Sequence, residues 1–375
     1  MVVTWHIIFS VVKESVFLLR NGVNIYDGGS LQAAPWLLTI FSTIDGIFNN
    51  QFSLRIFFIA VDFLVASALY RLTQLIGKEK SRLTPTQVAK CYLYNPFGII
   101  AVLGMNWTLF VALLQLTALD LALQGKELIA AAVCGFLIHL DFYNLALLAP
   151  ISLASKNPKK AAFNILLFSG LFLITSPVLL SAYWNINSSS LLGVIDSVYI
   201  SRMRMDSLRP NSGMFWYLYA QSFPVFTPLL KITFQMTLAV FWPACSIKFR
   251  SDPVFMFIAL MGSQMILKPY PSVVDYALYF GLLMTQFHLF ERARVLLVAF
   301  FVAFGVYVLK MQIWRYWIEL PGFNANFYYI FTLIWNAILI IMYLDVIAAY
   351  NKHQIYRDNK KLKDKEYEKC KLFQR

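Results

Sequence analysis

Long apolar runs alternate with short polar or basic loops along most of the chain. Residues 54–76 and 161–183 are each long enough to cross a bilayer, which takes about 20 residues of helix. Many other runs are shorter and are interrupted by proline, amide or acidic residues. A lipid-facing helix does not tolerate such breaks, because the freed backbone groups find no hydrogen-bond partner in hydrocarbon. The pattern therefore predicts an all-α, polytopic membrane protein with broken and re-entrant helices.

Several runs are expected to be divided. Asn95-Pro96 cuts the run 88–103, which is followed by 106–123, and the run 128–153 bends near His139 and Asp141. Residues 214–247 contain three prolines and are expected to form a kinked or divided helix. The other expected segments are 35–48, as a re-entrant or interfacial piece, and 253–266, 273–290, 295–308 and 326–349. The total is about ten to eleven segments.

The two ends differ from the middle. Between Ile8 and Arg20, apolar residues fall on one helical arc and polar residues mostly on the other, which predicts a helix lying at the membrane surface. Residues 24–29 follow as a turn-forming loop. We expect residues 1–30 to be a lumenal surface helix and loop, 31–350 a multi-span transmembrane domain, and 351–375 a basic cytoplasmic tail.

Composition and charge support a membrane protein with a fixed orientation. The 375 residues are 59% hydrophobic and only 14% charged, against roughly 25% charged in soluble domains. The net charge is +13. The basic stretches at 78–82, 156–160, 248–250 and 292–294 and the tail all fit on one side, which the positive-inside rule makes cytoplasmic. The tail thus indicates topology rather than nucleic-acid binding.

The sequence carries little sign of catalytic or metal chemistry. The four cysteines are far apart and form no CxxC pair, and the four histidines are scattered. This argues against a metal site, a cofactor and a nucleophile triad. Asn187-Ser188-Ser189 is a glycosylation sequon that matters only if its loop is lumenal.

Three segments begin with polar and aromatic residues on the same predicted, non-cytoplasmic side. Two prolines break the chain in Lys268-Pro269-Tyr270-Pro271, and Asp275 follows about one turn into the next helix. Residues 210–217 contain Asn211 and Trp216, and residues 324–329 contain Asn324 and Asn326. Amides and aromatic rings suit sugar hydroxyls, and Lys or Arg suits phosphate. Interfacial anchoring and helix capping are the alternative explanation.

Some ionisable residues fall within or beside apolar segments, where charge is costly. They are Asp62, His139, Asp141, Lys231, Asp275 and His288. For each residue, two interpretations are open: a hydrogen bond that stabilises helix packing, or a role in chemistry.

These same stretches resemble the PIG-U family of GPI transamidase subunits. The matching motifs occur in the family's order: Asn24-Ile25-Tyr26-Asp27-Gly28-Gly29, Tyr92-Leu93-Tyr94-Asn95-Pro96, Pro210-Asn211-Ser212-Gly213-Met214-Phe215-Trp216-Tyr217, Lys268-Pro269-Tyr270-Pro271 with Asp275-Tyr276-Ala277-Leu278-Tyr279, and Asn324-Ala325-Asn326-Phe327-Tyr328. Each motif is short, and the ordered set covers most of the chain.

The resemblance implies a multi-pass endoplasmic reticulum protein with a helical bundle like that of GT-C glycosyltransferases. It implies a non-catalytic subunit that binds the GPI lipid or the attachment signal and assembles with other transamidase subunits, including the cysteine-protease-like catalytic one. Asn324 and Asn326 are the first candidates for GPI contact, followed by Asp275, Asn211 and Trp216. The resemblance also implies a transmembrane helix ahead of the surface helix, and only residues 1–7 precede that helix here.

Two other classes remain open. A GT-C mannosyltransferase of GPI assembly would place acidic residues on the first lumenal loop, where this chain offers Glu14 and Asp27 but no close pair. A transporter would fit the broken helices, but the sequence has no two-fold internal repeat.

Overall fold

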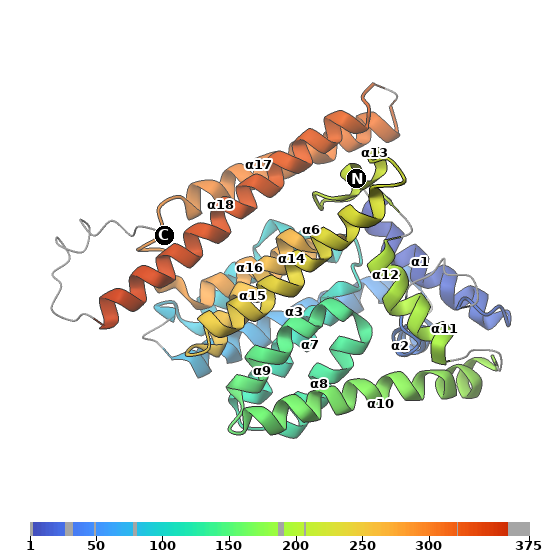
Figure 1. Ribbon diagram of the computed structural model, residues 1–375, viewed down its shortest axis with the longest axis horizontal. Helices are drawn as coiled ribbons and strands as arrows, with labels where there is room; N and C mark the ends of the chain where they lie inside the picture. The colour runs from blue at the N-terminus through green and yellow to red at the C-terminus, as the bar shows by residue number, and fades with distance from the viewer. Residues whose placement is uncertain are drawn as a thin grey trace. The chain divides into compact units, whose positions relative to one another are not determined.

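The computed structural model describes residues 3–26, 33–48, 50–77, 81–186, 191–205, 208–320 and 322–358. Every regular element in these ranges is a helix, and none is a strand (Figure 1). The all-α, multi-pass prediction is confirmed. The sequon at Asn187, the acidic residue Asp27 and residues 359–375 of the predicted tail lie outside the described ranges.

The chain divides into two units, residues 1–79 with 83–285 and residues 80–82 with 286–375. In the first unit the helices are α1 (Val3–Arg20), α2 (Pro35–Ile47), α3 (Gln51–Ile76), α5 (Pro85–Leu93), α6 (Pro96–Leu103), α7 (Thr108–Leu123), α8 (Glu127–Leu140), η1 (Phe142–Leu147), α9 (Leu148–Ala154), α10 (Pro158–Trp184), α11 (Leu191–Ile195), η2 (Asp196–Ile200), α12 (Ser201–Arg204), α13 (Trp216–Gln221), α14 (Thr227–Lys248), α15 (Pro253–Leu267) and α16 (Val273–Thr285). In the second unit they are η3 (Phe287–Leu289), α17 (Leu296–Ile318) and α18 (Ala325–Asp358).

Local chemistry sets the predicted breaks. Asn95 ends α5 and caps α6, where its side-chain oxygen accepts from the Phe97 N–H at 3.1 Å and Pro96 occupies the first turn. Asp141 caps η1 in the same way, through the Tyr143 N–H at 3.4 Å. The run at 214–247 is divided into α13 and α14, with Pro243 inside α14.

The hairpin of α15 and α16 forms the centre of the first unit. Almost every residue of both helices is buried, and α16 packs against α3, α5, α6 and α7. Gly281 lets α16 approach α5 closely, because a Cβ there would lie 2.8 Å from the Tyr92 ring. A helix that is apolar on every side is a core helix.

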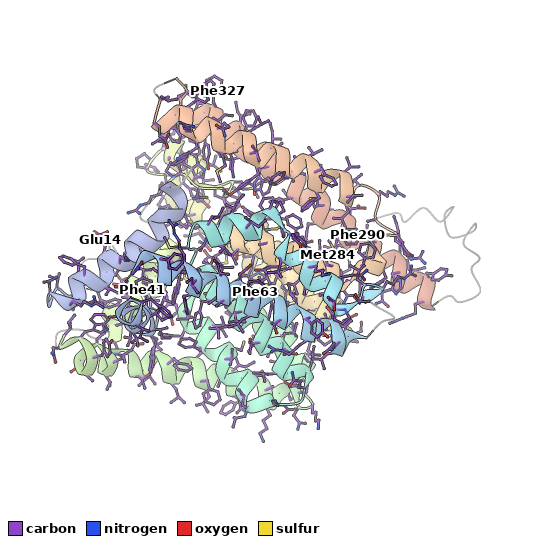
Figure 2. All side chains as sticks on the ribbon, turned by 180° about the vertical axis from the view of Figure 1, so that it is seen from behind. Glu14, Phe41, Phe63, Met284, Phe290 and Phe327 are labelled. Atoms are coloured by element: carbon purple, nitrogen blue, oxygen red, sulfur yellow. The ribbon has the colours of Figure 1, made fainter. Side chains whose placement is uncertain are left out.

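Helices α10 and α14 carry the opposite pattern. Few of their residues are buried, and Phe163, Val178 and Val240 are at least 66% exposed. Five helices are long and apolar enough to span a membrane: α3, α10, α14, α17 and α18. Their exposed apolar side chains, such as the labelled Phe63 on α3 in Figure 2, match a lipid surface.

The second unit contains an antiparallel hairpin of α17 and α18, which lie side by side (Figure 1). Helix α17 extends past its predicted end at residue 308, and α18 extends past its predicted end at residue 349. The Lys310 side chain is fully buried, and its ammonium lies 4.8 Å from the Tyr307 ring centre and 5.4 Å from that of Trp335. The faces of these aromatic rings stabilise the ammonium group, so that Lys310 can lie inside the apolar helix α17. Residues 351–358, expected in the tail, continue α18.

The part of the chain between α10 and α13 is partly helical. It contains α11, η2 and α12, which pack inward through the fully buried Val194 and Val198. The Ser197 hydroxyl donates to the Tyr26 carbonyl at 3.1 Å, which ties this section to the loop after α1. The sequence pattern missed these helices because each is shorter than two turns.

Candidate functional site

Two of the polar motifs meet at the turn between α15 and α16. The Cα of Gly213 lies against this turn so closely that a Cβ would be 2.7 Å from the Pro269 carbonyl oxygen and 3.0 Å from the Pro271 ring. The Gly213 N–H donates to the Asn211 side-chain oxygen at 2.6 Å, and the Asn211 amide donates to the Arg209 carbonyl at 3.0 Å. Asn211 therefore shapes the loop that rests on the proline turn.

Asp275 takes part in capping the N-terminus of α16. Its carboxylate accepts from the Ser272 N–H at 2.7 Å, while the Ser272 hydroxyl accepts from the Val274 N–H at 3.2 Å. This is a capping-box arrangement with aspartate in the glutamate position. The same hydroxyl contacts the Asn106 amide at 3.0 Å and the Thr108 hydroxyl at 2.8 Å. Ser272 thus holds the turn to the start of α7, and Asp275 fixes the Ser272 backbone.

Lys268 is part of an ion-pair network that the motif alone does not reveal. Its ammonium lies 2.7 Å from one Asp141 carboxylate oxygen, and Arg202 lies 3.1 Å from the other. Arg202 also donates to the Leu140 carbonyl at 3.2 Å. The three side chains are only 16–23% exposed, so the network joins the ends of α8 and α15 to α12 in a poorly solvated place.

The pKa values of this network follow from its charges. Asp141 and Lys268 stand directly after α8 and α15, outside both helices. Burial raises the pKa of the Asp141 carboxyl, but the charges of Lys268 and Arg202 outweigh burial and lower it overall. Burial lowers the pKa of Lys268, and the charges of Asp141 and Asp275 more than reverse that effect. Both groups are therefore held in their charged forms.

Aromatic and amide groups surround the network. The Lys268 ammonium lies 5.6 Å from the centre of the Tyr143 ring, and the Tyr143 hydroxyl contacts Gln235 of α14 at 3.3 Å. Gln264 donates to the Tyr143 carbonyl at 2.9 Å. Trp216 begins α13 and is only 5% exposed. It is thus part of the packed loop rather than an open aromatic platform.

Asn324 and Asn326 belong to the second unit, at the turn between α17 and α18. Both are exposed. The Asn324 side-chain oxygen accepts from the Asn326 N–H at 3.0 Å and from the Phe327 N–H at 3.4 Å, so Asn324 caps α18. Phe327, labelled in Figure 2, is 47% exposed beside them. The structure thus brings Asn211 and Asp275 to one turn, and Asn324 and Asn326 to another.

Most of the other ionisable residues have partners within the packing. The Tyr92 hydroxyl donates to Asp62 at 2.9 Å. The two nitrogens of His139 contact the Tyr199 hydroxyl at 2.8 Å and the Ser176 hydroxyl at 3.2 Å. Lys231 donates to the carbonyls that end α12. These contacts support a packing role for each residue.

Sequence reasoning overlooked a cleft of about 500 Å³ at the ends of α1 and α10. It is lined by Leu19, Arg20, Ser42, Thr43, Gly46, Tyr183, Trp184 and Asn185. The Arg20 guanidinium donates to the Ser42 hydroxyl at 3.0 Å and lies 3.9 Å from Asp45. None of the five predicted site residues lines this cleft. Its only sequence signal is the polar end of each flanking helix, which is common at helix termini.

Comparison with known proteins identifies the family to which this chain belongs. The sequence model described as GPI transamidase subunit PIG-U matches residues 2–335 of this chain. The chain belongs to the PIG-U family.

Relatives in fungi and mammals agree with PIG-U family membership. The GPI transamidase component GAB1 of Saccharomyces cerevisiae is 24% identical over 340 residues, which cover 90% of this chain and 84% of the relative. The GPI-anchor transamidase component PIGU of Homo sapiens is 25% identical over 383 residues, with 92% and 86% covered. The GAB1 homolog of Schizosaccharomyces pombe is 25% identical, with 90% and 83% covered.

The predicted family resemblance is therefore confirmed, and with it the assignment to the subunits of the GPI transamidase complex. No relative supports the mannosyltransferase alternative. The roles expected for Asn324, Asn326, Asp275, Asn211 and Trp216 remain predictions.

Proposed function

We propose that this chain is a non-catalytic, multi-pass subunit of a GPI transamidase complex in the endoplasmic reticulum membrane, with its C-terminus in the cytoplasm. The observation that carries the proposal is the family match across residues 2–335. Its partners are the other transamidase subunits, including the cysteine-protease-like subunit that performs the chemistry. Its ligand is the GPI lipid, bound by protein groups alone without metal, cofactor or nucleic acid.

Asn326 is the proposed primary contact with the GPI headgroup. Its side chain is exposed at the first turn of α18, and its backbone N–H is held by Asn324. A carboxamide offers both a donor and an acceptor to a sugar hydroxyl. Asn324 has its oxygen engaged in the cap, so its role is to position Asn326 and to offer its remaining N–H groups.

The loop at 210–217 and the proline turn supply the second proposed contact. Asn211 and Asp275 fix the shape of this region, as their hydrogen bonds to Gly213 and Ser272 indicate. Trp216 is buried at the start of α13, directly after the loop. The exposed edge of the loop would then meet either the glycan or the attachment signal.

Complementation tests the family function. A strain lacking its transamidase U subunit should regain surface display of GPI-anchored proteins when this chain is expressed. The tagged chain should also retain the protease-like subunit through detergent purification. Failure of both, with the chain expressed in the membrane, overturns the proposal.

Asn326→Ala tests the headgroup contact. We expect both unattached GPI and uncleaved precursor to accumulate while the complex assembles normally, because Asn326 is exposed and alanine keeps the backbone N–H that Asn324 holds. Asn324→Asp keeps the cap and removes the proposed N–H contact, whereas Asn324→Ala also loses the cap at a cost of about 1 kcal/mol, so the pair separates capping from contact. Normal display in the Asn326→Ala strain would remove Asn326 from the site. Normal GPI retention by the purified variant complex, with impaired precursor binding, would assign it to the attachment signal.

A further inference from the structure

A group of cations gathers at the end of the second unit where α17 begins and α18 ends. This basic collar consists of Arg82, Arg292, Arg294, Lys352 and Arg357. Hydrogen bonds from the backbone at the start of α17 to one side chain of α18 bring the two helices together there. The Asp345 carboxylate of α18 accepts from the Val295 N–H at 2.9 Å and from the Arg294 N–H at 2.9 Å.

The collar residues are arranged around one place. The Lys352 ammonium donates to the Arg292 carbonyl at 3.4 Å, and the Arg292 guanidinium lies 4.3 Å from the centre of the Tyr356 ring. The Arg82 guanidinium pairs with Glu291, the neighbour of Arg292 in the chain, and the His353 ring lies edge-on to the His288 ring with centres 4.4 Å apart. Five cations from three separate stretches of chain therefore converge.

Few acidic groups balance these charges. Among the side chains that the structure describes in this group, Glu291 pairs with Arg82. Asp345 is bonded to the backbone N–H groups that begin α17, including that of Leu296 at 3.1 Å. Arg294 forms no ion pair with an acid of the described residues, and its side chain is exposed. The collar thus retains excess positive charge.

The collar lies next to a surface suited to lipid chains. Val295, Leu297 and Val298 are 40%, 62% and 67% exposed and directly follow Arg294. Both helices are long and apolar enough to cross a membrane. Cations at the end of such a hairpin stand at the depth of lipid phosphates. Arginine also matches phosphate geometry through paired N–H groups.

We propose that the basic collar binds the phosphate headgroup of an anionic membrane lipid in the leaflet at this end of the α17–α18 hairpin. The adjoining apolar residues receive the acyl chains, which makes a lipid rather than a free phosphate the ligand. The site is separate from the proposed GPI contacts at Asn326, which stand at the opposite end of the hairpin.

Lipid binding by the purified full-length chain tests the collar. Native mass spectrometry in detergent should show retention of added phosphatidylinositol over phosphatidylcholine. Arg294→Gln/Arg357→Gln should weaken that retention about fivefold for each cation removed. Arg315→Gln is the matched control, because Arg315 is exposed at the other end of α17, where it pairs with Glu319 at 3.1 Å.

Four results would overturn the proposal. In the first two, retention of phosphatidylinositol is unchanged in the double variant or is lost equally in Arg315→Gln. Glycerophosphoinositol, the headgroup without acyl chains, could bind as tightly as the lipid, which would assign the collar to a soluble phosphate. Finally, the double variant could keep its lipid but lose a transamidase subunit on purification, which would make the collar a protein contact.

Discussion

Gly213 has a role that its neighbours dictate. Its Cα faces the carbonyl oxygen of Pro269, and the space left for a side chain is smaller than a methyl group requires. The chain could not move easily to make room, because Pro269 and Pro271 stiffen the turn. At this position, therefore, the absence of a Cβ lets the loop at 210–217 rest on the proline turn.

Gly213→Ala should destabilise the protein by about 1–3 kcal/mol, as overpacking against backbone does. The thermal midpoint of the detergent-purified chain should fall by several degrees. Gly46→Ala is the control, because nothing lies within 4 Å of a Cβ at that position. Equal midpoints for the two variants would show that the loop does not pack as described.

The Asp141 carboxylate forms ion pairs with two cations, Lys268 and Arg202. Asp141→Asn keeps the oxygen that caps η1 but leaves Lys268 and Arg202 close together without a counter-charge. We expect a loss of about 3–5 kcal/mol, the range for a buried pair that loses one partner. Adding Lys268→Met should recover part of that loss. Urea or thermal denaturation of the single and double variants provides the thermodynamic cycle. Additive losses would mean that the two side chains do not interact.

Not all of this residue-level structure was open to prediction. The polar character of 268–275 is visible in the sequence, and Asp275 follows from a local capping pattern. The pairing of Asp141 with Lys268 and with Arg202 joins positions separated by 127 and 61 residues. No local pattern encodes such distances.

At the scale of elements, close helix contacts depend on small residues. Helices α8 and α10 approach so closely that a Cβ at Gly135 would lie 2.8 Å from the Ile165 carbonyl oxygen and 2.7 Å from the Cβ of Phe168. In membranes, such approach replaces hydrophobic burial as a source of packing energy. Close van der Waals packing at Gly135 therefore holds α8 and α10 together.

Gly135→Ala should separate α8 from α10 and lower stability by about 1–3 kcal/mol, despite the better helix propensity of alanine. Gly170→Ala on α10 has open space around it and should be neutral or slightly stabilising. Thermal midpoints of the two purified variants would separate these effects. A stable Gly135→Ala protein would contradict the described contact.

The element pattern was predictable where local signals were strong. Asn95-Pro96, the bend at Asp141 and Pro224 all marked real breaks, because caps and prolines act on their own backbone, whereas Pro243 lies within α14. The true length of α17 was not predictable from hydropathy. Lys310 interrupts the apolar run in sequence, and only the rings of Tyr307, Tyr328 and Trp335 make its burial tolerable.

At the scale of the whole molecule, charge asymmetry predicts orientation. Arg250 follows α14 on the predicted cytoplasmic side, and Phe323 lies between α17 and α18 on the other side. Arg250 is exposed, and Phe323 is 42% exposed. Both positions are therefore suited to chemical labelling.

In a chain with Cys91 and Cys370 replaced by serine, Arg250→Cys should react with an impermeant thiol reagent in intact microsomes. Phe323→Cys should react only after permeabilisation. Cys134 and Cys245 are buried and give little background. Labelling of Phe323→Cys in sealed vesicles would reverse the proposed topology.

The sequence by itself determined that this protein crosses a membrane several times, where its helices break, and to which family it belongs. These properties reside in composition, in local capping and in ordered motifs. Tertiary structure alone decided that α15 and α16 form the centre of the first unit, that Lys268 shares Asp141 with Arg202, and that Asn324 caps while Asn326 stays exposed. In a membrane protein both the core and the lipid-facing surface are apolar. Hydropathy therefore marks which segments are helices but not which helices pack against each other. That packing depends on glycine contacts and paired polar groups far apart in the chain.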